Sequence, residues 1–173
     1  MIIANRKIPE LNIDRSEYKP FIHNDWFRKH YMWFAYGLMV LILVIAMILR
    51  RLSVGSLWMT ALVYLAVYVT HEALHVLTVC QKGDVYLSRS GLYLWLTPDF
   101  PLSKWHFWFF ISTPLLVLTG LTGVLSFFVP GEAARWLKFI AWTNAFTAGS
   151  DIINSVLVLV KPRKSVFYRG YYK

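Results

Sequence analysis

Four long runs of apolar residues, separated by short polar or basic segments, dominate the sequence. They cover residues 31–49, 56–80, 105–129 and 139–160. Each is close to or above the roughly 20 residues that a helix needs to cross a hydrocarbon core of about 30 Å. The runs lack the alternation of apolar and polar positions that is typical of barrel strands, and helices satisfy their own backbone groups in lipid. The pattern therefore predicts an all-α membrane protein with four transmembrane helices.

The apolar runs also divide the chain into three regions. Residues 1–30 form a mostly polar N-terminal segment, residues 31–160 the transmembrane domain, and residues 161–173 a basic tail rich in aromatic residues. The first run follows 30 residues that include four acids, and it is longer than the apolar part of a signal peptide. We therefore expect it to be retained as the first membrane helix.

The loop between the second and third runs is predicted to contain a short β-hairpin. Residues 85–87 and 92–96 are rich in Val, Leu, Tyr and Trp, and they flank the sequence Ser-Arg-Ser-Gly at positions 88–91. Two such runs around a short polar segment are typical of paired strands with a turn. The apolar content of this hairpin suggests that it lies against the membrane.

The distribution of Lys and Arg predicts the orientation of the helices. Four spans place both termini and the central loop on one side, where fourteen Lys and Arg lie, against three in the other two connections. The positive-inside rule places the fourteen in the cytoplasm. Membrane orientation thus accounts for most of the net charge of +9, and nucleic acid is not an expected partner. The tail is expected to anchor on anionic lipid.

Four ionisable groups lie deep within the apolar runs: His71, Glu72, His75 and Asp151. Such groups are expensive in a membrane and are usually functional when they occur there. His71 and His75 begin and end the sequence His-Glu-Ala-Leu-His, and residues four apart lie on one face of a helix. The two imidazoles can therefore bind one zinc ion, while Glu72 acts as general base towards a zinc-activated water.

Asp151 is the candidate for a third zinc ligand, since catalytic zinc sites normally have three protein ligands. At about 1.5 Å per residue, Asp151 lies roughly 15 Å from the basic end of its helix. His71 and His75 lie about 16 and 10 Å from the end of theirs. The second and fourth helices run in the same direction, so the three side chains are predicted to reach a similar depth.

Two further residues invite functional hypotheses. Asn144 lies two turns before Asp151 and could donate to the transition state, orient a zinc ligand, or simply hold two helices together. Pro114 lies at nearly the depth of the metal in the third helix, where it should kink the helix and free a carbonyl, which could open a path for water or for substrate. We treat a purely structural kink as the simpler interpretation of Pro114.

The whole pattern resembles a small family of bacterial membrane proteins described as zincin peptidases and, more distantly, the intramembrane site-2 metalloproteases. The residues that carry the resemblance are His71-Glu72-Ala73-Leu74-His75, Thr113-Pro114-Leu115, Asn144 and Gly149-Ser150-Asp151. The resemblance implies zinc held by His71, His75 and Asp151, Glu72 as base, and a hairpin that pairs with substrate. Site-2 proteases usually have an Asn-x-x-Pro element and an Asp-Gly pair around the third ligand. Both are missing here, which favours a continuous fourth helix.

The leading functional hypothesis is a zinc metallopeptidase in the bacterial cell membrane that cleaves a membrane or membrane-proximal protein. A non-catalytic membrane regulator or self-protection protein with a structural or vestigial metal site is the alternative. A di-iron oxygenase also uses His-x-x-x-His spacing, but the remaining histidines are too few for it. The sequence leaves open the substrate, the oligomeric state and whether cleavage takes place within the bilayer.

Overall fold

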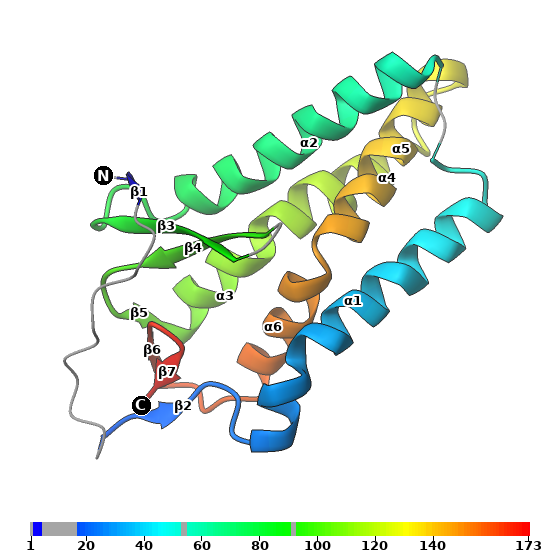
Figure 1. Cartoon of the computed structure of the whole chain (residues 1–173). Helices are drawn as coiled ribbons and strands as arrows, with labels where there is room; N and C mark the ends of the chain where they lie inside the picture. The colour runs from blue at the N-terminus through cyan, green and yellow to red at the C-terminus, as the bar shows by residue number, and fades with distance from the viewer. Residues whose placement is uncertain (1, 5–16, 53–54, 91–92) are drawn as a thin grey trace.

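The computed structural model describes residues 2–4, 17–52, 55–90 and 93–173, and it is mostly helical (Figure 1). The helices are α1 (Asp25–Ile48), α2 (Leu57–Leu77), α3 (Lys104–Pro114), the π-helical segment η1 (Leu115–Leu121), α4 (Thr122–Leu125), α5 (Gly131–Thr147) and α6 (Gly149–Leu159). The strands and both chain termini lie at one end of the helices (Figure 1).

Three of the four predicted spans are confirmed as helices long and apolar enough to cross a membrane. They are Asp25–Ile48, Leu57–Leu77 and the run Lys104–Leu125, which joins α3, η1 and α4. Their outer faces carry many exposed Leu, Val, Ile, Phe and Trp side chains. Such broad apolar surfaces are expected where helices face lipid rather than water.

The fourth predicted span is not the continuous helix that the missing proline and glycine favoured, and the open question of a break near Asp151 is thereby answered. Residues 139–160 are divided between α5 and α6, which meet at Ala148 with φ −82° and ψ 17°. Figure 1 shows the change of direction there. The Thr147 hydroxyl donates to the carbonyls of Thr143 at 3.3 Å and Asn144 at 3.0 Å, and such back-bonding often bends helices. Gly149 follows at once, and glycine weakens a helix.

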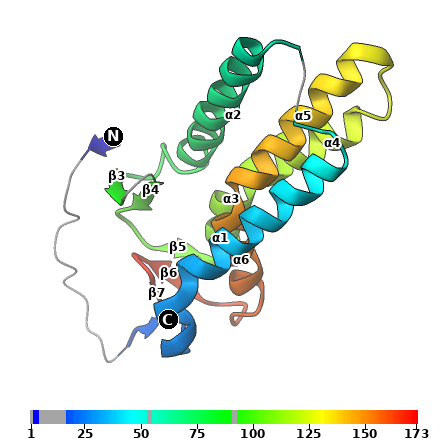
Figure 2. The same ribbon diagram turned by 45° about the vertical axis from the view of Figure 1, so that its right-hand side comes forward.

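The bend also allows α1 to approach α6 closely. A Cβ at Gly149 would lie 2.5 Å from Met39 Cγ and 3.1 Å from the Ala35 carbonyl oxygen. Tyr31, almost two turns into α1, donates its hydroxyl to the Ser150 carbonyl at 3.1 Å and to Asn154 Oδ1 at 3.0 Å. Helix α1 therefore packs on α5 and α6, whereas α2 packs on α3 and α5. Figure 2 shows α1 and α2 on different sides of the bundle.

The predicted β-hairpin is confirmed, with longer strands than expected. Strands β3 (Val85–Ser90) and β4 (Tyr93–Pro98) pair antiparallel from Val85 opposite Pro98 to Ser90 opposite Tyr93. Strand β1 (Ile2–Ala4) pairs parallel to β3 on its other side. The predicted turn ends at Gly91, which lies outside the described residues.

The C-terminal tail forms a second sheet, which was not expected from the sequence. Its strand order is β2 (Lys19–Pro20), β7 (Tyr171–Tyr172), β6 (Val166–Tyr168) and β5 (Leu102–Ser103). Arg169 and Gly170 connect β6 to β7 with φ of 43° and 81°, as a tight hairpin turn requires. Phe167 stacks on Phe107 with ring centroids 4.7 Å apart, so the sheet is packed on the start of α3.

Lys104 stabilises the end of α6. It is a buried residue, and its ammonium group donates to the carbonyls of Leu159 at 2.8 Å and Lys161 at 2.5 Å. The last carbonyls of a helix lack partners within the helix, and a cation there also interacts favourably with the helix dipole.

Replacing Lys104 with Met should therefore lower stability by about 1–3 kcal/mol, because two carbonyls at the end of α6 lose a charged donor. Thermal unfolding in detergent, compared with the exposed-site control Lys164→Met, would measure the effect. Equal unfolding temperatures for the two variants would contradict this role of Lys104.

Candidate metal centre

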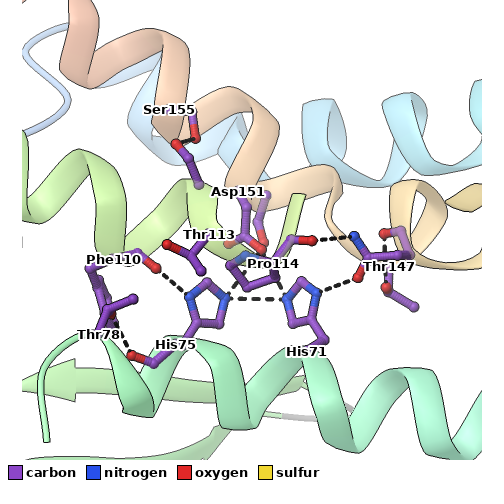
Figure 3. A network of polar contacts seen from close by, with 12 residues as sticks. His71, His75, Thr78, Phe110, Thr113, Pro114, Thr147, Asp151 and Ser155 are labelled. Atoms are coloured by element: carbon purple, nitrogen blue, oxygen red, sulfur yellow. Dashed lines mark hydrogen bonds and ion pairs between the residues drawn. The ribbon is translucent and has the colours of Figure 1, made fainter. Parts of the chain in front are cut away.

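Three polar side chains from two helices converge at the centre of the bundle (Figure 3). His71 and His75 project from one face of α2, and Asp151 lies in the first turn of α6. The two histidine Nε2 atoms are 3.2 Å apart. Asp151 Oδ2 lies 3.0 Å from His71 Nε2 and 3.4 Å from His75 Nε2. The structure thus brings together the three residues that the depth estimates place at a similar level.

The triangle of donor atoms fits a zinc ion. Ligand atoms about 2.0–2.1 Å from a tetrahedral zinc are about 3.3 Å from one another, and the three observed separations bracket this value. Two imidazole nitrogens and one carboxylate oxygen are a donor set that zinc prefers. Three protein ligands also leave a fourth position for water or substrate, as catalytic sites require.

A backbone carbonyl orients His75. Its Nδ1 lies 2.6 Å from the carbonyl oxygen of Phe110 in α3 (Figure 3). Since a carbonyl can only accept, the imidazole Nδ1–H is the donor. An imidazole that binds a metal is neutral and carries one N–H, so with Nδ1 protonated its Nε2 lone pair would be available to a metal ion at the centre. His75 is only 6% exposed, which holds the ring in this orientation.

Asn144 orients His71 in the same way. Its Oδ1 lies 2.8 Å from His71 Nδ1, and its amide nitrogen donates to the Pro114 carbonyl and to Thr119 Oγ1, each at 3.0 Å. Asn144 is completely buried. Both amide hydrogens are used inside the protein, which argues against Asn144 as a donor to a transition state. The geometry favours the hypothesis that it orients a ligand, an arrangement common around metal-bound histidines.

Glu72 lies next to this centre without being part of the triangle. It is partly buried and lines the same cavity as His71, His75 and Asp151. The cavity has a volume of about 700 Å³ and is bounded by α1, α2, α3, the α5–α6 junction, strand β4 and the β6–β7 turn. Its lining includes Tyr36 from α1, Tyr64 and Tyr68 from α2, and Thr97 from β4. This space is large enough for a segment of peptide.

The C-terminal hairpin closes one side of the cavity, where Arg169 and Gly170 contribute to the lining. Arg169 forms an ion pair with Asp99, which also accepts from the Tyr168 hydroxyl at 3.1 Å. Partial loss of hydration raises the pKa of the Tyr168 phenol, a rise that Arg169 opposes and Asp99 reinforces. The phenol therefore keeps its proton and donates. Aromatic residues on both sides of Arg169-Gly170 are typical of a β-hairpin. From the sequence alone, these aromatic residues were expected to anchor the tail on lipid.

Comparison with protein families identifies the chain. The sequence model of a family described as "Putative zincin peptidase" matches residues 64–166. The chain belongs to this family. The match includes His71, Glu72, His75, Asn144 and Asp151, and the name zincin implies zinc. Comparisons with curated proteins and with solved structures found no significant match.

Metal analysis of purified protein would test the ligand assignment. We expect about one zinc per chain in the wild type and a strong loss in His75→Ala and in Asp151→Ala, because each change removes one of three donors. His106→Ala is the matched control, since His106 is exposed and contacts Lys82 and Ser103 instead. Stoichiometric zinc in Asp151→Ala would contradict the assignment.

Proposed function

We propose that this protein is a zinc metallopeptidase that hydrolyses peptide bonds of membrane or membrane-proximal proteins. The observation that carries the proposal is the triangle of His71, His75 and Asp151, which opens with Glu72 onto one large cavity. Membership of the zincin peptidase family supports the same class of reaction.

Zinc, when bound by these three residues, supplies a Lewis acid that polarises a peptide carbonyl and increases the acidity of water. Glu72 takes the proton from the attacking water and passes it to the leaving amine, as a general base and then a general acid. Asn144 and the Phe110 carbonyl keep the two imidazoles facing the centre.

Strand β4 is a suitable surface for binding the substrate. Its residues Trp95 to Pro98 line the cavity, and it lies at the edge of its sheet, with β3 as its strand partner among the described residues. An extended peptide can add to such an edge through main-chain hydrogen bonds. A substrate helix would have to unwind to bind there, because peptidases act on extended segments.

The proposed enzyme has both termini in the cytoplasm, in accord with the distribution of its Lys and Arg. Helices α5 and α6 together would complete the fourth crossing of the membrane. The strands, the tail and the β4 edge then lie towards the cytoplasmic face (Figure 1), which favours cleavage in or near that half of the bilayer.

The variant Glu72→Gln distinguishes the peptidase proposal from the alternative of a non-catalytic metal protein. The change keeps size and zinc ligands but removes the base, so we expect activity to fall about 10²–10⁴-fold with zinc retained. The measurement is the abundance of new protein N-termini in membranes of cells that express the wild type or the variant.

The control is Glu132→Gln, which makes the same change at an exposed position in the first turn of α5. It should produce the wild-type set of new N-termini. If wild-type protein produced no new N-termini, or if Glu72→Gln produced the same ones, the peptidase proposal would be wrong and the non-catalytic alternative would be favoured.

A further inference from the structure

The third span contains a proline whose effects reach both histidines. Pro114 ends α3, and the π-helical segment η1 begins at the next residue. Because proline has no N–H, it cannot donate to the carbonyl of Phe110, four residues earlier. That carbonyl instead accepts from His75 Nδ1 at 2.6 Å. The side chain of a zinc-site histidine thus takes the place of a missing helical hydrogen bond.

The carbonyl of Pro114 itself acts on the other histidine. It accepts from the Asn144 amide nitrogen at 3.0 Å, and Thr119 Oγ1 accepts from the same nitrogen. An amide group can be turned over, which exchanges its donor and acceptor sides. The two acceptors in the third span fix the nitrogen on their side, so Oδ1 must face His71 Nδ1, at 2.8 Å.

We propose that the junction of Pro114 with η1 is a positioning element for both zinc-binding histidines. It acts on His75 directly through the Phe110 carbonyl and on His71 through Asn144. In both rings it places the proton on Nδ1 and leaves the Nε2 lone pair for the metal. The inference rests on the proposed zinc site. It means that Pro114 positions metal ligands as well as bending its helix.

The burial of these groups makes the arrangement effective. Pro114 and Asn144 are among the most completely buried side chains of the described residues, and His71 is 4% exposed. Water is therefore a poor substitute for either hydrogen bond. Hydrogen-bond partners of metal ligands typically contribute 10–100-fold to metal affinity, and the Phe110 carbonyl should contribute within this range.

Zinc titration against a competing chelator, with Pro114→Ala in detergent, is the first part of the test. Alanine restores an N–H that competes for the Phe110 carbonyl, so we expect zinc affinity to fall about 10–100-fold. Pro130→Ala is the matched control, because this proline is exposed and precedes α5. The control should bind zinc as the wild type does.

Proton and nitrogen magnetic resonance of the zinc-loaded protein, labelled in histidine, is the second part. In Pro114→Ala the Nδ1–H resonance of His75 should move to the position of a weaker hydrogen bond, more than that of His71. Asn144→Leu should show the reverse order, because it removes the link to His71 and leaves the bond between His75 and the Phe110 carbonyl in place. This residue-specific pattern distinguishes ligand positioning from a general distortion of the helix.

Zinc affinity within twofold of wild type in Pro114→Ala, with both resonances unchanged, would overturn the inference and leave the peptidase proposal intact. Equal shifts of both resonances in both variants would also overturn it. If Pro114→Ala fails to fold, Asn144→Leu still tests the inference. An unchanged Nδ1–H resonance of His71 in that variant would contradict the proposed link from Pro114 through Asn144 to His71. Wild-type protein that binds no zinc would overturn both proposals.

Discussion

The approach of one carboxylate to two imidazoles, deep among apolar helices, is the interaction on which the rest of the structure depends. Asp151 Oδ2 lies 3.0 and 3.4 Å from the two Nε2 atoms. Buried charge of this kind is costly unless it is paired or bound to a metal. A zinc ion would balance the carboxylate and use both imidazole lone pairs. The Phe110 carbonyl and Asn144 Oδ1 accept from the two Nδ1 atoms, which turns both Nε2 lone pairs towards the centre.

The break between α5 and α6 is the second constraint, because it sets where Asp151 lies. Small residues at the break permit a close approach of α1 to Gly149. Tyr31 then donates to the Ser150 carbonyl and to Asn154, which ties α1 to the first two turns of α6. Helix α1 thus holds the start of α6 in place from outside the metal centre, while α2 supplies the histidines from the other side (Figure 2).

The features that could be predicted from the sequence depend on residues that are close together along the chain. Hydropathy predicted the three spans that the structure confirms. The β-prone residues on both sides of a short polar segment predicted the hairpin. The spacing of four residues on a helix predicted that His71 and His75 lie side by side. Depth along two parallel helices was enough to predict that Asp151 lies close to the two histidines, because the rise per residue is nearly constant.

The features that escaped prediction depend on tertiary contacts or on backbone atoms. The bend at Ala148 has no proline to mark it, and it follows from the Thr147 hydroxyl together with the packing of α1 on Gly149. The hydrogen-bond partner of His75 is the backbone carbonyl of Phe110. Because every residue has a backbone carbonyl, no pattern of side chains in the sequence could predict this partner. The C-terminal sheet was missed because its aromatic residues fit lipid anchoring equally well by composition.

The central claim is that two histidines and one aspartate hold a single zinc ion, and X-ray absorption spectroscopy of the zinc-loaded protein tests it most directly. The account predicts four nitrogen or oxygen neighbours at about 2.0–2.2 Å, including the outer-shell scattering of two imidazole rings. A spectrum with sulfur at about 2.3 Å, or one without imidazole scattering, would contradict it.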